Sequence, residues 1–370
     1  MLKVAIVGCG KIADAHASQI QRIKGCEIVG VCDRELLMAQ QLYERFPVKR
    51  YFTDLTDLLN DARPDVVHIT TPPESHFDLA RLCLEGGCHV YVEKPFTLDA
   101  REAEELVELA ERRGLGLTVG HDAQFNHAAK LMRELIRGGY LGDAVVHMES
   151  YCGYDLGYAT SARAFLGEKD HWVRKLPGGL LQNVISHGIA RIAEFLTGNN
   201  PHVAACGFVG PFLRGIGEDD MLDELRVIIV DERHTTAYLT FSSRMRPLLD
   251  EFRIFGSRNG LMLDEQQQTL VKLRGQAFKS YVERFVPSLV FAKQYLVNAG
   301  RNMRLFLANE FHMEAGKKEL VAAFYRSIRE GAPAPIPSRE ILLTARLIDA
   351  IFEQVAKAPA PPYGVGAPRS

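Results

Sequence analysis

Lys94 is the first side chain in this 370-residue chain whose setting suggests proton chemistry. It follows the apolar run 90–92 and precedes Pro95, so it stands at the carboxyl end of a predicted buried strand. Ligands of parallel sheets bind at that edge. Burial there would lower the pKa of the amine and let it exchange a proton with a hydroxyl group. A solvated lysine at a strand end is the alternative that the spacing leaves open.

His187 is the second such side chain, and it follows Asn183 by four residues. Residues four apart share one face of a helix, here the helix predicted over 180–197. Gly178 and Gly179 precede it and let backbone or ligand come close. An imidazole titrates near neutrality, which suits a general base. A purely structural histidine is the alternative at this point.

A glycine turn near the N-terminus predicts a dinucleotide site. Gly8, Gly10 and Ala13 follow a short apolar strand and open a helix, which is the context in which G-x-G-x-x-G/A carries meaning. Gly8 permits the tight turn, Gly10 admits a pyrophosphate, and Ala13 allows close packing of helix and strand. Lys11 and Ile12 begin the helix, whose N-terminal N–H groups favour phosphate.

Asp33 ends the next predicted strand, 27–32. An acid at this place accepts the hydroxyls of an adenosine ribose and repels a 2′-phosphate, so it favours NAD over NADP. Arg34 weakens that preference, since a guanidinium could pair with a 2′-phosphate. A plain helix N-cap is the alternative role for Asp33.

The spacing of apolar residues predicts two domains. Residues 1–121 alternate short apolar strands with helices, which indicates a parallel sheet covered on both faces. Residues 122–357 contain longer alternating strands, typical of a mostly antiparallel sheet with one face open. Ser338 is expected to cap a final helix over 338–357, and 358–370 is expected to be a flexible tail.

The strands are predicted over 2–7, 27–32, 65–70, 88–92, 116–119, 145–151, 203–209, 225–230, 235–241 and 252–255. The helices are predicted over 11–24, 34–45, 54–60, 75–86, 98–113, 126–137, 180–197 and 338–357, with 281–330 mainly helical. Each segment is assigned as helix or strand from the spacing of its apolar residues.

Net charge and cysteine content exclude several classes of protein. A net charge of −2 offers no basic face to nucleic acid, which we therefore exclude as a partner. Seven scattered cysteines without framework spacing predict reduced thiols in a cytoplasmic protein. No secretory signal, membrane span or metal site is expected.

The chain resembles the Gfo/Idh/MocA oxidoreductases (the glucose–fructose oxidoreductase, inositol dehydrogenase and MocA type). The resemblance rests on four ordered motifs, which are the glycine turn, the segment 70–76, Glu93-Lys94-Pro95, and the segment from Gly178-Gly179 to His187. It implies an N-terminal Rossmann domain and a C-terminal α/β domain with a large open sheet. That sheet is expected to join homodimers or homotetramers.

The resemblance also implies roles for individual residues. The family lysine and histidine correspond to Lys94 and His187, and the Lys94–Pro95 peptide is expected to be cis. The cofactor is expected to be NAD, bound further by these five residues: Thr71, Pro72, His76, Glu93 and Lys94.

Two features depart from the family pattern. Asn183 replaces the usual aspartate, and it can orient a hydroxyl but not take its proton. No arginine lies near Gln124, which indicates a different substrate shape. Trp172 and Arg174 lie in a basic segment that could grip a sugar and an anionic group, although a solvated loop is an equal alternative.

These features predict an NAD-dependent dehydrogenase of carbohydrate metabolism that acts on a secondary hydroxyl or keto group of a sugar, sugar acid or nucleotide sugar. His187 would be the base, Lys94 would stabilise the alkoxide, and Asn183 would orient the substrate. An enzyme that retains NAD and cleaves or isomerises glycosides by transient oxidation is one alternative. A non-enzymatic regulator that senses dinucleotide is another.

The apolar and basic block 281–307 has two readings. It could be an amphipathic helix at a membrane surface, but we favour a subunit contact or a cover of the core.

Overall fold

The computed structural model describes residues 1–156, 166–275, 281–312 and 314–357. The first sheet has six parallel strands in the order β3-β2-β1-β4-β5-β6. The chain adds β2 and β3 on one side of β1 and then β4, β5 and β6 on the other, so the gap between β1 and β4 is the switch point of a doubly wound sheet, where ligands bind. The strands are β1 (Leu2–Val7), β2 (Cys26–Cys32), β3 (Tyr51–Phe52), β4 (Val66–Ile69), β5 (His89–Val92) and β6 (Leu117–Val119).

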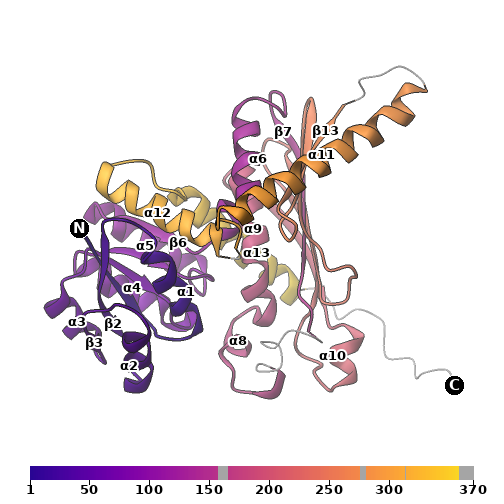
Figure 1. Ribbon diagram of the computed structural model, residues 1–370. Coiled ribbons are helices and arrows are strands. Elements are labelled where there is room, and N and C mark those ends of the chain that lie inside the picture. The colour runs from indigo at the N-terminus through magenta and orange to yellow at the C-terminus, as the bar shows by residue number, and fades with distance from the viewer. Residues whose placement is uncertain (157–165, 276–280, 313, 358–370) are drawn as a thin grey trace.

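Helices cover both faces of this sheet, at the left of Figure 1. They are α1 (Lys11–Ile20), α2 (Leu36–Arg45), α3 (Leu55–Ala62), η1 (Pro73–Ser75), α4 (His76–Glu85) and α5 (Ala100–Arg113). Local signals set their ends. Asp99 caps α5 by accepting from Glu102 N at 2.8 Å, and Gly114 ends the helix in the left-handed conformation.

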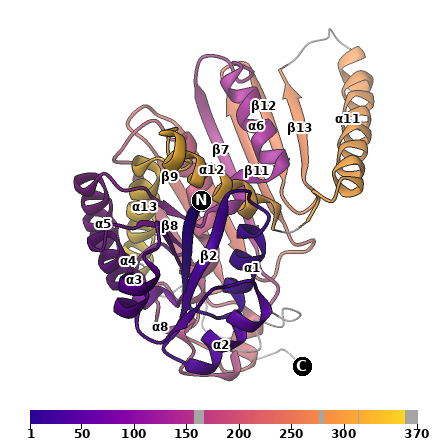
Figure 2. The ribbon, with the colours of Figure 1, turned by 60° about the vertical axis from the view of Figure 1, so that its left-hand side comes forward.

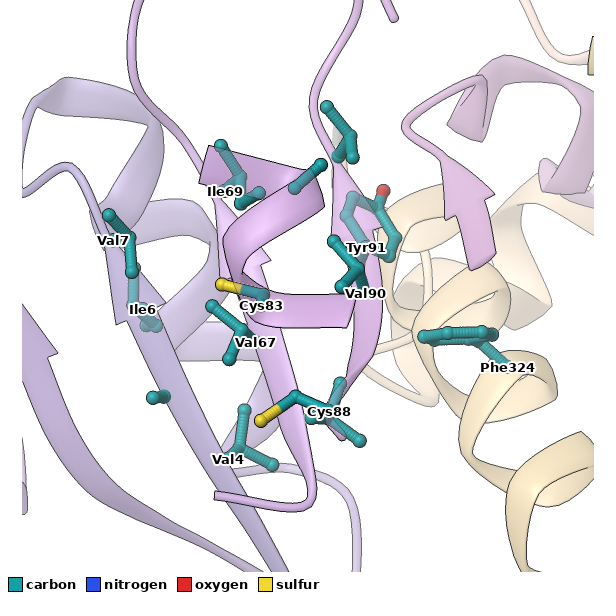
Figure 3. Packing of buried hydrophobic residues seen from close by; sticks show 14 of the residues in the cluster. Val4, Ile6, Val7, Val67, Ile69, Cys83, Cys88, Val90, Tyr91 and Phe324 are labelled. Atoms are coloured by element: carbon teal, nitrogen blue, oxygen red, sulfur yellow. The ribbon is translucent and has the colours of Figure 1, made fainter. Parts of the chain in front are cut away.

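The core of this half is a continuous apolar layer between sheet and helices. Val4, Ile6, Val67 and Val90 are fully buried, as Figure 3 shows, because a parallel strand covered on both faces must be apolar throughout. Phe324 enters the same layer from α12 (Ala315–Glu330), a helix of the C-terminal half. The two halves therefore share packing.

The second sheet has seven strands in the order β13-β12-β11-β7-β10-β9-β8. All neighbours are antiparallel except β7 and β10, which are parallel. The strands are β7 (Val145–Gly153), β8 (His202–Phe208), β9 (Glu224–Val230), β10 (Thr236–Ser242), β11 (Asp250–Gly256), β12 (Asn259–Asp264) and β13 (Thr269–Arg274).

One face of the second sheet packs on α9 (Gly179–Phe195), α6 (His127–Arg137) and α13 (Ser338–Lys357). Figure 1 shows α9 and α13 between the two sheets. The remaining elements are η2 (Asp122–Phe125), α8 (Trp172–Lys175), α10 (Pro211–Gly215) and α11 (Val282–Leu307). Within the described residues, no helix is long and apolar enough to cross a bilayer.

The predicted fold class is confirmed, and the bounds of α13 match the predicted 338–357. Three strands were not predicted. β3 has two residues, and β12 and β13 form a hairpin in which polar residues such as Asn259, Gln267 and Thr269 interrupt the apolar pattern. The predicted boundary at 121/122 falls between β6 and η2, and the predicted tail lies outside the described residues.

Candidate active site

A cavity of about 480 Å³ lies at the carboxyl ends of β1, β2 and β4. Its lining includes six residues that the motifs place at the cofactor: Gly8, Gly10, Asp33, Arg34, Thr71 and Pro72. Thr70 and Glu74, from the segment 70–76, also line it. Six of the twelve predicted cofactor residues therefore line one cavity.

The glycine turn has the shape that a pyrophosphate requires. Gly8 has φ +91°, and a Cβ there would lie 2.6 Å from Thr71 Cγ2, so neither conformation nor space admits a side chain. A Cβ on Gly10 would meet nothing within 4 Å, so the space beside this backbone is open. The first N–H groups of α1, at Lys11 and Ile12, have no carbonyl partner within the helix and can serve phosphate oxygens. Ala13 is fully buried, as close packing requires.

Asp33 supports the glycine turn from the second strand. Its Oδ2 accepts from Cys9 N at 2.7 Å and its Oδ1 accepts from Glu35 N at 2.9 Å. Each carboxylate oxygen has a further lone pair for a ribose hydroxyl. Arg34 is exposed at the rim. The residues fit NAD.

His76 and Glu93 lie behind this cavity and are not part of its lining. The His76 ring nitrogens lie 2.8 Å from the carbonyl oxygens of Thr71 and Pro95, so the imidazole ties together the loops that follow β4 and β5. Burial lowers its pKa. The Lys94–Pro95 peptide is cis, as predicted.

Glu93 belongs to a buried polar chain. Its Oε1 lies 2.7 Å from His16 Nε2 and 2.7 Å from Lys317 Nζ. On one side His16 Nδ1 lies 2.7 Å from His68 Nδ1, and on the other Lys317 Nζ lies 3.2 Å from Asp122 Oδ2. Lys317 and His16 hold the pKa of Glu93 well below its usual range despite burial. The role of Glu93 here is to anchor α12 and to position Lys94, whose backbone N donates to its Oε2 at 3.1 Å.

Lys94 reaches across to the second domain. Its Nζ donates to Asn183 Oδ1 at 3.0 Å and to Asn183 O at 3.1 Å, which leaves one of three N–H groups for a ligand. Burial lowers the pKa of this amine. Because Oδ1 of Asn183 accepts from Lys94, the amide NH₂ of Asn183 stays available as a donor. His187 lies one turn further along α9, about 6 Å along the helix axis.

His187 lines a second cavity, of about 760 Å³, between η2, the β12–β13 hairpin and the start of α12. Its Nδ1 is buried and meets no hydrogen-bond partner among the described residues. Burial lowers the pKa of His187 to about 4, and Asp122 opposes that shift. The His121 ring lies beside it at 6.0 Å between centroids. The imidazole is therefore neutral near pH 7.

The cavity of His187 is rich in carboxyl groups. Four of them line it: Asp122, Asp250, Glu265 and Glu314. No lysine or arginine does so among the residues described. Burial raises the pKa of Glu265 to about 8 although Arg191 lies 2.6 Å away, and burial also raises the pKa of Asp250 and Glu314. Such a cavity suits hydroxyl or ammonium groups better than an anion.

Trp172 and Arg174 lie away from this cavity. Arg174 makes a bidentate ion pair with Glu218, at 2.9 and 2.8 Å, and lines a separate cavity with Gly178 and Gly179. Trp172 packs against a small apolar cluster that includes Val173 and Leu180. That Trp172 and Arg174 contact the substrate stays a prediction, and an anionic group would have to compete with Glu218 for Arg174.

Comparison with known proteins agrees with this geometry. Residues 2–121 match the model of the GFO_IDH_MocA oxidoreductase family, described as an NAD-binding Rossmann fold. This N-terminal part of the chain is therefore similar to the Gfo/Idh/MocA oxidoreductases and has an NAD-binding Rossmann fold.

Individual relatives support the assignment to different extents. D-glucoside 3-dehydrogenase of Escherichia coli (strain K12) is 34% identical over 39% of this chain and 42% of its own length. The chain thus matches less than half of that relative. An uncharacterised Escherichia coli (strain K12) oxidoreductase, YhhX, is 26% identical over 83% of both chains. The WlbA dehydrogenase of Bordetella pertussis, solved with NADH and UDP-GlcNAcA, shares the fold, with TM-score 0.75, 16% identity, and coverage of 96% and 95%.

Proposed function

We propose that this protein is an NAD-dependent oxidoreductase that interconverts a secondary alcohol and a ketone on a neutral or basic sugar or polyol. The observation that carries the proposal is the contact of Lys94 Nζ with Asn183, which brings the amine of one domain to the helix that bears His187. A neutral imidazole and an amine with a lowered pKa at one junction are suited to handle a hydroxyl proton.

His187, Lys94 and Asn183 have different roles in the proposed reaction. NAD, held by the residues of the cofactor cavity, would supply the acceptor for the hydride of the carbinol carbon. His187 takes the hydroxyl proton as the alcohol becomes a ketone, and its imidazole becomes an imidazolium. The remaining N–H of Lys94 donates to the oxygen as negative charge develops on it. The free NH₂ of Asn183 donates to a neighbouring hydroxyl and fixes the orientation of the ring.

The low pKa of His187 has a consequence for turnover. At pH 7 the side chain begins each cycle as a base, and the imidazolium that forms readily loses its proton to water. The base therefore returns to its starting state without help from a second acidic group.

The carboxyl groups around His187 favour a neutral or basic substrate over an anionic one. An anionic group would meet Asp250 and Glu314 with no lysine or arginine in the described lining, whereas Asp122 already pairs with Lys317 at 3.2 Å. A polyol can donate hydroxyls to these carboxyls, and an amino sugar can form ion pairs with them. The name of the similar D-glucoside 3-dehydrogenase supports a sugar as the substrate class. The similarity to that enzyme covers only part of this chain.

A substrate panel tests this proposal. Reduction of NAD would be followed by absorbance at 340 nm with four classes: free hexoses and inositols, amino sugars, uronates, and UDP-sugars. We expect turnover with the first or second class, and more than tenfold lower kcat/KM with the matched uronate. Turnover confined to uronates or UDP-sugars would overturn the substrate class. Cleavage of a glycoside without net NADH would instead select the NAD-retaining alternative.

Other predictions stay open. Asp33 at the cofactor cavity supports a preference for NAD over NADP. A homodimer or homotetramer joined by the open sheet, and a cytoplasmic location, remain predictions.

A further inference from the structure

Helix α11 carries many apolar side chains that are exposed to solvent. It packs on β13 by one face, where Gln294 Oε1 accepts from Lys272 N at 2.8 Å and Asn298 Nδ2 donates to Leu270 O at 2.9 Å. Asn298 is the only fully buried residue described in this helix of 26 residues. Figure 2 shows α11 standing beside β13 at the edge of the molecule, with its outer side uncovered.

The outer side of α11 carries a regular apolar stripe. Successive members lie alternately three and four residues apart, and every member is exposed. We call this stripe the α11 seam: Val282, Phe285, Leu289, Ala292, Leu296, Ala299, Met303 and Phe306.

The spacing of the seam indicates what covers it. An average repeat of 3.5 residues keeps one narrow line of side chains against another helix, whereas a helix lying on a membrane needs a wide apolar face opposite a polar one. On α11 the side opposite the seam faces the sheet, where Gln294 and Asn298 bind. Val290, Tyr295 and Val297 are also exposed and flank the seam. The regular 3.5-residue repeat of the seam fits a partner helix.

The order of residues in the seam indicates that the partner is the same helix. From the centre at Leu296, an alanine, a longer aliphatic side chain and a phenylalanine follow in each direction along the chain. When two copies run antiparallel with Leu296 at the two-fold axis, Leu289 faces Met303 and the two alanines face each other. The phenylalanines then pack at the two ends. Such self-complementarity is the requirement of an isologous interface.

The area of the seam is sufficient for this contact. Its six large side chains are between 48% and 74% exposed. At about 150–200 Å² for each, they offer roughly 600 Å² per chain. Flanking Tyr281, Tyr295 and Leu307 are also exposed and raise the area toward the ~800 Å² per partner of a standard interface.

We infer that α11 pairs antiparallel with α11 of a second copy of this chain through the α11 seam. This contact is separate from any contact made by the open face of the second sheet. It also lies apart from the two cavities of the active site, so its loss leaves the chemistry intact.

The first test measures assembly mass by sedimentation velocity at about 20 µM. Leu296→Glu places a charge at the centre of the seam on a side chain that contacts little within its own chain. The control Leu82→Glu changes an exposed leucine of α4. We expect L296E to have half the mass of the wild type, and L82E to keep the wild-type mass and Tm. Equal masses for wild type and L296E, or a monomeric wild type, would overturn the inference.

The second test determines direction and does not depend on L296E. In a Cys206→Ser background, which removes the exposed cysteine, Phe285→Cys and Phe306→Cys proteins are prepared separately and then mixed under oxidising conditions. We expect disulfide-linked dimers from the mixture and few from either protein alone. Dimers from each protein alone would indicate a parallel pair and overturn the antiparallel arrangement. Binding of monomers to phosphatidylserine vesicles, with no cross-linking, would show that a membrane covers the seam instead.

Discussion

The cofactor cavity and the His187 cavity are built in opposite ways. The first is assembled from short contiguous motifs at neighbouring strand ends, such as Gly8, Asp33 and Thr71. The second draws Asp122, His187, Asp250, Glu265 and Glu314 from segments up to almost 200 residues apart. A ligand shared by many proteins can be recognised from a local pattern, whereas the selective surface for a substrate depends on how distant segments meet.

His187→Ala gives the largest expected effect and tests the His187 cavity alone. Removing the base should lower kcat by about 10²–10⁴ while NAD affinity changes little, since His187 is not part of the cofactor cavity. Stopped-flow or steady-state kinetics and NAD titration measure the two effects. His202→Ala, at an exposed histidine, is the control. Wild-type kcat in H187A would remove His187 from the mechanism.

Gly8→Ala should act on the cofactor cavity alone. The added Cβ would lie 2.6 Å from Thr71 Cγ2 at φ +91°, so the turn must shift and NAD affinity should fall by about 10²-fold or more. Gly87→Ala is a matched control, because Gly87 has φ +83° but no atom within 4 Å of the added Cβ. G87A should lose only about 1 kcal/mol of stability and bind NAD normally. Equal NAD affinity in G8A and wild type would contradict the assigned pyrophosphate site.

Acid should destabilise the junction of the two regions. The pKa values of His121 and His187 are lowered by burial to about 3 and about 4, so below pH 6.5 these two groups bind more protons in the unfolded chain than in the native one. The contribution of each histidine is complete above pH 6.5 and falls as pH drops toward 4, by up to about 1.4 kcal/mol per pH unit. The pKa of Glu265, raised by burial to about 8, acts in the opposite direction, so urea unfolding at pH 7.5, 6 and 5 compares wild type with His121→Gln. The variant should lose less stability than wild type between pH 6 and 5, and equal slopes for the two proteins would be inconsistent with a buried neutral His121.

Asp33→Asn gives the smallest effect and sharpens the description of the cofactor cavity. The amide keeps one oxygen acceptor but removes the charge that repels a 2′-phosphate. We expect the NAD/NADP affinity ratio to fall about tenfold, or about 1.4 kcal/mol, by fluorescence titration. Glu74→Gln, on the same cavity, is the control. An unchanged NAD/NADP affinity ratio would indicate that Asp33 only supports the backbone, by accepting hydrogen bonds from Cys9 N and Glu35 N.

Sequence patterns predicted the cofactor half well because its physical requirements are local. Gly8 needs a positive φ, Ala13 needs a small side chain, and both needs can be read from a strand–turn–helix segment. The patterns also indicated Lys94, Asn183 and His187, since strand ends and a four-residue spacing identify them.

The remaining site residues carried no local signal. Glu265 lies in the unpredicted β12–β13 hairpin, and Lys317 lies on a helix of the C-terminal half that returns to the first domain to meet Glu93. The ion pair of Arg174 could not be predicted because its partner Glu218 is 44 residues away. Only the tertiary fold shows which charges are already paired.

The most direct measurement of the central idea is a double-mutant cycle on Lys94 and His187. With the best substrate of the panel, kcat is measured for wild type, Lys94→Met, His187→Ala and the double variant. If both groups act on one alcohol, the double variant will be about as slow as the slower single variant, because each loss removes the same step. If the fold-decreases in kcat of the two single variants instead multiply in the double variant, the amine and the imidazole act independently. That result would contradict a shared active site at this domain junction.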